Sequence, residues 1–279
     1  MGVTNILKSV SSLDKHLLWI LLVLSICIPL IRPLGLPVTV TAMTQEFYDT
    51  IEKLPTGAKV WVEDAIQPQN MAELLPGIIA GMTHLMKKNL KIVIGTTSDP
   101  TAIGVYTEFI LPALQSRGVL TKYGVDWVRL PFIPGGETGL AAEAANIRST
   151  TPVDFYGTQL DRLPVMQGLN SVKDFDLVIM FGMSGTFFAY IRQVQAPYKV
   201  KFICDELTID IPAIMSYYPA QVSAIMKGLG GAAEYEKLIG YPGSATRYTE
   251  GLSLSYVILL LAVIAANVYY VANKHRRKK

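Results

Sequence analysis

An uncharged stretch near the C-terminus, Leu252 to Ala272, limits the folds open to this chain more than any other feature. A helix of about 21 residues rises some 30 Å, which matches the thickness of a membrane's hydrocarbon core. A mostly basic run follows it directly at positions 274–279. Because basic flanks stay on the cytoplasmic side of a membrane, the pattern predicts a transmembrane helix over residues 252–272 and a basic cytoplasmic tail over residues 273–279.

A second apolar stretch, Leu17 to Ile31, lies near the N-terminus and is shorter. A helix of about 15 residues rises only some 22 Å, so residues 32–40 must complete a crossing, with the Arg32 side chain reaching toward the interface. This interpretation gives an N-terminal cytoplasmic segment over residues 1–16 and an anchor over residues 17–40. A cleaved signal peptide is the alternative, because lysines precede the apolar core and small residues follow it.

Two retained spans place the part of the chain between them on one side of the membrane. Basic residues flank the apolar stretches at both ends of the chain, so both termini are expected in the cytoplasm and the central domain is expected to be extracytoplasmic. The expected localisation is thus that of a two-pass protein of the cell membrane. Its expected partners are the lipid bilayer and either further copies of the chain or other membrane-protein subunits.

The composition excludes several classes of protein. Hydrophobic residues make up 51% of the chain and charged residues 17%, and much of the net charge of +3 comes from the C-terminal tail. A near-neutral domain gives little support for nucleic-acid binding, and none is expected. Since Cys27 and Cys204 are the two cysteines of the sequence, a zinc site built on cysteines is excluded. Cys204 is expected to be an inert core residue.

Between the two apolar stretches, over residues 44–248, short β-type runs alternate with helical patterns. The runs are rich in valine, isoleucine, leucine and phenylalanine, as in strands that are covered on both faces. Alternation of this kind predicts a Rossmann-like α/β domain with a mostly parallel five-stranded sheet and helices on both faces. The expected strands are Ala58–Val62, Lys91–Ile94, Asp126–Phe132, Leu177–Phe181 and Lys199–Ile203.

Two regions depart from this alternation. Residues 150–174 carry repeated turn signals and are expected to form a long loop, of the sort that serves as a lid, a binding loop or a partner contact. Residues 212–239 have a broad apolar and aromatic side and are expected to be largely helical. That helix would pack on the sheet or, through its Met and Tyr residues, at a subunit interface.

Small, hydroxyl and acidic residues follow the expected strands, at the edge where open parallel sheets bind ligands. Before a helix, such loops expose backbone N–H groups and the positive end of the helix dipole, which favour an anion. The same residue types are also ordinary turn and capping residues. The candidate ligand-binding residues are Asp64, Thr96, Thr97, Ser98, Gly135, Gly136, Glu137, Thr138, Ser184, Gly185, Thr186 and Asp205.

Support for chemistry at these strand ends is weak. Ser184 follows a strand, but its surroundings depart from the G-x-S-x-G pattern of a nucleophile elbow at Thr186. A reactive serine also needs a base. The domain's one histidine, His84, lies late in the first expected helix and is expected to be a surface or helix C-terminal residue, far from the strand ends. The acidic pairs Glu63-Asp64 and Asp205-Glu206 could ligate a divalent cation. No catalytic residue, metal or cofactor is predicted, since the sequence has no phosphate-loop, zinc-helix or dinucleotide motif.

Three functions remain open at this point. The first is a structural or interaction subunit of an oligomeric membrane assembly. The second is an extracytoplasmic ligand-binding or sensing module for a small anionic ligand at the carboxyl ends of the strands. The third is a hydrolase or transferase that uses Ser184 or the acidic strand ends. The sequence favours the first over the second, and the second over the third.

Overall fold

A computed structural model of the chain describes residues 15–276, which fall into two compact units. The first unit holds helix α2 (Lys15–Ile31) and most of helix α13 (Ser244–Arg276), and the second, residues 38–245, is an α/β domain. The predicted N-terminal segment 1–16 lies almost wholly outside the described residues, and the predicted basic tail 273–279 lies partly outside them.

The domain contains one sheet of six strands, all parallel, in the order β3-β2-β1-β4-β5-β6. This is the doubly wound order of Rossmann-like folds, in which the chain moves outward from β1 and then resumes from β4 on the other side. The prediction of a parallel α/β sheet is therefore confirmed. The strands are β1 (Lys59–Asp64), β2 (Lys91–Gly95), β3 (Trp127–Arg129), β4 (Leu177–Gly182), β5 (Phe202–Glu206) and β6 (Ala224–Lys227).

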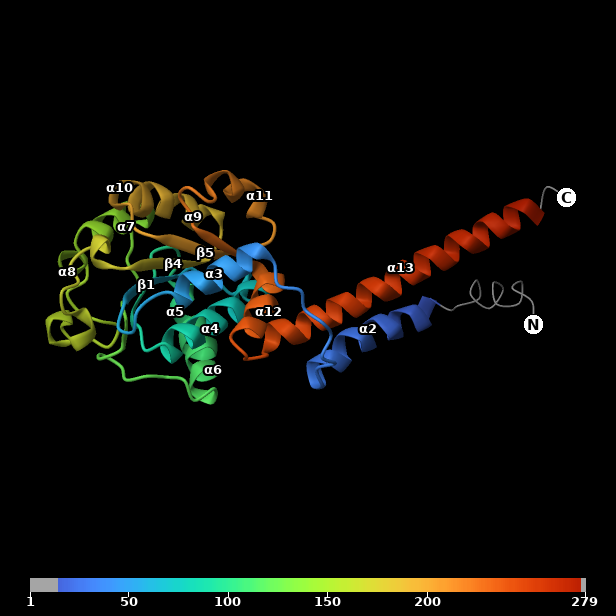
Figure 1. Cartoon of the computed structure of the whole chain (residues 1–279), viewed down its shortest axis with the longest axis horizontal. Coiled ribbons are helices and arrows are strands. Elements are labelled where there is room, and N and C mark those ends of the chain that lie inside the picture. Colours follow the sequence, from blue (N-terminus) through green and yellow to red (C-terminus); the bar gives the residue numbers. More distant parts are fainter. Residues whose placement is uncertain (1–14, 277–279) are drawn as a thin grey trace. The chain divides into compact units, whose positions relative to one another are not determined.

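Helices cover both faces of the sheet, as predicted (Figure 1). On one face lie α3 (Ala42–Glu52), α4 (Met71–Lys87), α5 (Thr101–Val105), the π-helical turn Tyr106–Ile110, α6 (Leu111–Ser116) and α12 (Gly228–Leu238). On the other face lie α7 (Gly136–Ala145), α8 (Ile147–Thr150), α9 (Ser184–Tyr190), the π-helical turn Ile191–Gln195, α10 (Ala196–Tyr198) and α11 (Ile211–Ile214). Between α8 and β4 the chain makes the predicted long excursion, which contains the 3-10 turns Leu160–Arg162, Pro164–Met166 and Val172–Asp174.

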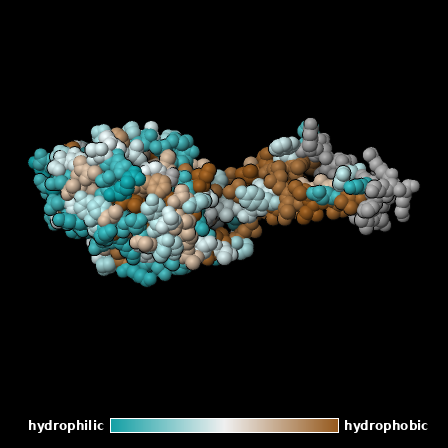
Figure 2. All heavy atoms as spheres, turned by 90° about the horizontal axis from the view of Figure 1, so that it is seen from above, coloured by the Kyte–Doolittle hydropathy of each residue, from teal (hydrophilic) through white to brown (hydrophobic). Residues whose placement is uncertain are grey.

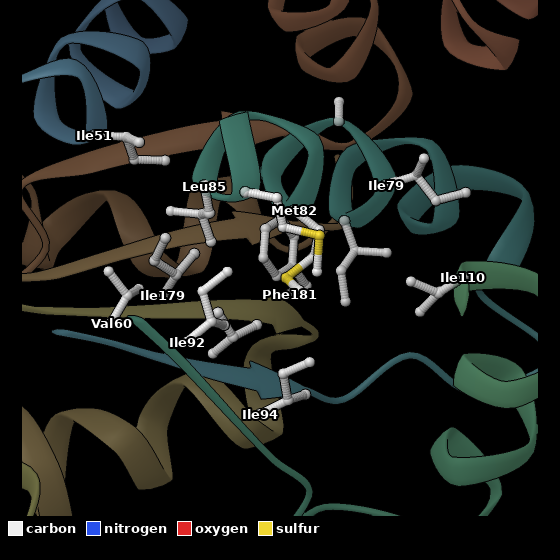
Figure 3. Close-up of a cluster of buried hydrophobic side chains, with 14 of the residues drawn as sticks. Ile51, Val60, Ile79, Met82, Leu85, Ile92, Ile94, Ile110, Ile179 and Phe181 are labelled. Carbon is white, nitrogen blue, oxygen red and sulfur yellow. The ribbon is translucent and has the colours of Figure 1, made fainter. Parts of the chain in front are cut away.

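The core on the α4 side of the sheet is built from alternate strand residues. Figure 3 shows Val60 and Ile179 on the side of the sheet that faces α4, the helix that carries Met82 and Leu85. Gly81 of α4 permits this close packing, because a Cβ atom there would lie 2.6 Å from the ring of Phe181. The continuous apolar runs of the strands thus follow from burial on both faces.

The sixth strand is the main correction to the expected fold. Residues 212–239, which were expected to be one long helical region, instead form most of α11, the 3-10 turn Met215–Tyr217, β6 and α12. Val222, Ile225 and Met226 are fully buried in or beside the sheet rather than on one side of a helix. A short continuous apolar run cannot be told from a buried helical segment by its periodicity alone, and this ambiguity produced the wrong prediction of five strands.

In the first unit, α13 contains one segment, Ser244–Val271, that is long and apolar enough to cross a membrane. Figure 2 shows a largely hydrophobic surface along the apolar helices, in contrast to the mixed surface of the domain. Helix α2 is apolar as well, but His16–Ile31 is shorter than the roughly 20 residues of a typical span. The expected C-terminal apolar helix is therefore present, and it indicates membrane association.

Helices α2 and α13 pack against each other in an antiparallel pair. The hydroxyl groups of Ser25 and Ser255 are hydrogen-bonded at 2.8 Å, and a Cβ atom on Gly251 would lie 3.2 Å from the backbone of Ile26. The carboxylate of Glu250, which is buried, accepts three backbone hydrogen bonds from residues 34–36, at 2.7, 2.8 and 3.0 Å. Small side chains and satisfied polar groups of this kind are typical of helix pairs in membranes.

Candidate functional site

The carboxyl ends of β1 and β4 lie side by side where the strand order reverses, which is the usual ligand crevice of a doubly wound sheet. In this domain the side chains at that point bond to one another. Glu63 accepts hydrogen bonds from the backbone N–H and hydroxyl of Thr97, at 2.8 and 2.9 Å. The second carboxylate oxygen of Glu63 accepts a hydrogen bond from the Tyr190 hydroxyl at 2.8 Å. The Tyr190 hydroxyl in turn accepts a hydrogen bond from Trp61 Nε1 at 2.9 Å. The crevice is thus filled by the domain's own side chains.

A buried ion pair lies on the other face of the sheet, at the same carboxyl ends of the strands. Asp64 Oδ2 lies 3.1 Å from Arg129 Nη1, and both side chains are almost fully buried. Arg129 also donates to the hydroxyl of Thr96 at 2.6 Å, and its guanidinium group lies 4.5 Å from the centre of the Tyr106 ring. The hollow beside Arg129 measures about 10 Å³, which is room for roughly one water molecule. Asp64 and Thr96 therefore serve this internal cluster.

Several buried carboxyl groups near the sheet are protonated more readily than usual. Burial raises the pKa of Glu63 to about 7 and that of Glu206 to about 9. Burial and the nearby Glu63 raise the pKa of Glu143 well above its ordinary range. Neither oxygen of Glu143 has a hydrogen-bond partner among the described residues. Carboxyl groups that retain their protons near neutral pH are poor ligands for cations. In addition, the described part of the chain contains no cluster of three or more His, Cys, Asp or Glu residues that could hold a metal ion.

The candidate residues from the sequence do not converge on one site. Asp205 is fully buried against α4, where a Cβ atom on Gly77 would overlap its carboxyl group, and burial raises its pKa. Ser98 and Gly185 are exposed, and the N–H of Thr186 is bonded to the carbonyl of Met183 in the first turn of α9. The backbone places Ser184 at the start of α9, but its side chain lies outside the described part of the structure.

A groove of about 440 Å³ opens at the carboxyl end of β3, next to the predicted strand-end residues 135–138. We call it the β3 groove. It is formed by three segments: the extended chain after β3, one side of α7, and the start of the long excursion. Its lining residues are Pro131, Phe132, Ile133, Pro134, Gly135, Thr138, Gly139, Ala142, Thr150, Thr151, Pro152 and Val153. Two of the predicted residues, Gly135 and Thr138, thus lie in this groove.

The residues that line the β3 groove are all uncharged, and their polar side chains are the hydroxyls of Thr138, Thr150 and Thr151. Helix α7 begins beside it at Gly136, and the N–H groups of Thr138 and Gly139, which line the groove, are both bonded to the carbonyl of Gly135. Thr151 is buried, and its hydroxyl has no hydrogen-bond partner within the described chain. The Thr151 hydroxyl oxygen is shielded from solvent, so it is not presented to a ligand in the groove.

Glu137 does not take part in the groove. Arg192 donates to both of its carboxylate oxygens, at 2.8 and 2.6 Å, and Gln193 donates to one of them at 2.8 Å. These hydrogen bonds lower the pKa of Glu137 to about 2. Glu137 therefore joins α7 to the π-helical turn Ile191–Gln195 and leaves the start of α7 without a competing carboxylate in the groove.

The histidine and the domain cysteine are both buried. His84 lies in the last turn of α4, as predicted, but its ring is buried rather than at the surface. It shares hydrogen bonds with Tyr235 (2.6 Å) and Glu52 (2.8 Å), and burial lowers its pKa. It is thus held in place in the core, away from Ser184. Cys204 is fully buried, as predicted, and burial raises the pKa of its thiol.

The sequence reasoning missed Arg129, Glu143 and Thr151. Arg129 had a signal, because a charged residue inside an otherwise apolar strand requires a buried partner. Glu143 had none, since a glutamate in an alanine-rich helix is ordinarily exposed. Comparisons of the chain with protein-family models, characterised proteins and solved structures gave no match.

Proposed function

We propose that this chain is a two-pass membrane protein whose extracytoplasmic α/β domain binds a small anionic ligand in the β3 groove. The groove is the observation that carries the proposal. Its volume of about 440 Å³ lies within the range of roughly 300–1,000 Å³ found for small-molecule sites. It lies beyond the carboxyl end of a parallel strand, beside the start of α7, and has Thr138 and Thr150 among its lining residues.

The pairing of α2 with α13 supports the two-pass arrangement. Glu250 and Ser255 lie in an apolar helix and are buried by contacts with the α2 segment. Without that segment the carboxylate of Glu250 would lose its three backbone donors, and an unsatisfied group in lipid costs several kcal/mol. The Ser255 hydroxyl would keep its hydrogen bond to the carbonyl of Gly251. The chain beyond α2 continues to residue 36 against Glu250, and we propose that these residues belong to the N-terminal anchor together with the 16 residues His16–Ile31 of the apolar helix.

Ligand binding is tested by blocking the groove. Ala142 lines the groove, whereas Ala145 is an exposed residue of the same helix outside it. We expect small carboxylates or phosphate esters to shift NMR signals of groove residues in the full chain in detergent. Ala142→Trp should abolish these shifts and Ala145→Trp should preserve them. A panel that leaves the groove signals of the wild-type protein unchanged would overturn the proposal.

The location of the domain is tested with a membrane-impermeant maleimide. Lys53 is largely exposed, so Lys53→Cys introduces an accessible thiol, and Cys27→Ser removes the exposed natural one. Cys204 is buried and provides an internal control that reacts after denaturation. Labelling of intact cells is the expected result, and labelling that requires lysis would place the domain in the cytoplasm.

A structural or interaction subunit of an oligomeric membrane assembly is the second candidate. The observation that favours it is the filled crevice between β1 and β4, where Glu63, Thr97 and Tyr190 bond to one another. A domain that no longer binds a ligand there can serve as a scaffold. Light scattering of the detergent-solubilised chain tests self-assembly, and a monomer at every concentration would remove that form of the proposal.

A further inference from the structure

We infer that two copies of the chain associate in the membrane through the side of α13 that faces away from α2, where their Asn267 carboxamides bond to each other. This inference rests on the part of the proposed function in which α13 crosses the membrane, and it does not depend on the ligand groove. It follows from the exposed side of α13, from the amide within that side, and from the common orientation of all copies in the bilayer.

One side of α13 is left uncovered by α2. Helix α2 contacts α13 at Gly251 and Ser255. Leu260 follows Gly251 by about two and a half helical turns, so it lies on the opposite side of the helix. The residues that share this opposite side are exposed and recur at alternating steps of four and three; they are Tyr256, Leu260, Val263, Asn267 and Tyr270. We call this set the α13 seam.

The spacing of the α13 seam suits a second, parallel helix. Steps that average 3.5 residues keep one stripe of a helix turned toward its partner in a left-handed pair, and this geometry is common among membrane helices. In lipid, apolar side chains alone drive association weakly, because the lipid tails are equally apolar. The polar residue within the stripe therefore supplies much of the preference for a partner helix over lipid.

Asn267 places an amide in the seam, four residues before the end of the apolar segment Ser244–Val271. One of its amide N–H groups donates to the carbonyl of Val263 at 2.8 Å. This bond directs the side chain toward the middle of the apolar segment rather than toward the basic tail. The side-chain oxygen has no hydrogen-bond partner among the described residues. Because lipid offers none either, a partner protein must supply it.

A second copy of the chain offers that partner at the same depth. The basic tail after α13 fixes its side of the membrane, so every copy inserts in the same orientation. Two parallel α13 helices then bring their Asn267 side chains together around a two-fold axis. A carboxamide is both a donor and an acceptor, so each side chain can donate its second N–H to the oxygen of the other. A single asparagine in such a stripe also fixes the register of the pair.

Cysteine cross-linking in membranes locates the contact. In a Cys27→Ser background, Val263→Cys places a thiol in the α13 seam and Leu261→Cys places one outside it. The two natural residues are similarly exposed, at 57% and 60%, and the remaining natural cysteine, Cys204, is buried. Mild oxidation should give a disulfide-linked dimer from Val263→Cys and little dimer from Leu261→Cys, as detected by gel electrophoresis without reductant.

Asn267→Leu tests the amide contact itself. Energy transfer between copies labelled at Lys53→Cys, in phosphatidylcholine vesicles of varied lipid-to-protein ratio, measures the affinity of the dimer. Asn267→Leu keeps the helix apolar and should weaken the dimer about fivefold or more. Asn267→Gln retains an amide and should keep most of the affinity. Val268→Leu is the matched control, at an exposed neighbouring position outside the seam, and should leave the affinity unchanged.

The outcomes separate this inference from the proposed function. A monomer at every lipid-to-protein ratio, equal cross-linking at positions 261 and 263, or wild-type affinity in Asn267→Leu overturns the inference. Cross-links from Val263→Cys to a different membrane protein, with none between copies, overturn it as well. Alkaline carbonate tests the membrane crossing separately. A chain that carbonate releases contradicts both the crossing and the dimer, whereas a monomer that resists carbonate contradicts only the dimer.

Discussion

The hydroxyl oxygens of Ser25 and Ser255 lie 2.8 Å apart, across two apolar helices from opposite ends of the chain. Cysteines at these positions should therefore form a disulfide. In a Cys27→Ser background, we expect Ser25→Cys with Ser255→Cys to cross-link under mild oxidation in membranes, as detected by mass spectrometry of the intact chain. Trp19→Cys, at an exposed position of α2, should not cross-link to residue 255. Loss of the N-terminal segment from the mature protein would contradict the pairing.

Glu250 should strengthen the same helix pair. Its carboxylate accepts the backbone N–H groups of Leu34, Gly35 and Leu36. Glu250→Leu leaves these donors without an acceptor, so the rate of the cysteine cross-link should fall several-fold. Glu250→Gln retains one acceptor oxygen and should give an intermediate rate. Equal rates in all three proteins would show that these hydrogen bonds do not hold the pair.

Protonation of Glu63 should make the stability of the domain depend on pH. Burial raises the pKa of Glu63 from 4.5 to about 7 in the folded state, so the folded protein binds this proton more tightly than the unfolded protein. The contribution is fully present below pH 4.5, declines as the pH rises toward 7, and amounts to ~3 kcal/mol at most. In Glu63→Gln the difference in unfolding free energy between pH 5 and pH 7 should shrink accordingly. Glu108→Gln, at an exposed site, should leave that difference unchanged.

Glu143 should destabilise the domain at alkaline pH. Its buried carboxyl group has no hydrogen-bond partner within the described structure, and ionisation there is disfavoured by burial and by Glu63. Glu143→Met removes the ionisable group at similar volume and should stabilise the domain by about 1–3 kcal/mol at pH 8. Glu63→Met should have the opposite effect, because it leaves three donors without an acceptor. Thermal unfolding of both variants at pH 8 measures the contrast.

Gly81 should tolerate no side chain. A Cβ atom at this position would lie 2.6 Å from the ring of Phe181, so Gly81→Ala should lower the unfolding free energy by roughly 1–3 kcal/mol through overpacking. Gly104 offers the matched control, since nothing lies within 4 Å of a Cβ atom there. Gly104→Ala, in a helix, should stabilise the domain by about 0.5–1 kcal/mol.

The class of the fold could be read from the sequence because the largely apolar runs of β1 to β5 alternate with helical patterns, as in a parallel sheet that is covered on both faces. The strand β6 could not be read in this way. Ala224–Met226 is short and follows an aromatic segment that itself forms a helix and a 3-10 turn, so its apolar residues fit a helical pattern equally well.

The candidate site could be predicted only in part. Strand ends point to one edge of a parallel sheet, and two of the residues predicted there, Gly135 and Thr138, line the β3 groove. The sequence could not show that Thr97 and Asp64 are bonded to internal partners. It also could not show that Thr151, from the long excursion, completes the groove, since contacts of irregular loops leave no periodic signal.

Helix α3 has a place in the fold that affects the order of assembly. It packs against β6 and α12, and the ring of Phe47 lies 5.3 Å from that of Tyr235. The first helix of the domain to be synthesised thus finds its partners among the last elements. Until β6 has been made, the apolar side of α3, including Phe47 and Ile51, remains uncovered. Completion of the domain is therefore a late event in synthesis, and a chain that stalls before β6 presents a ready target for chaperones or for aggregation.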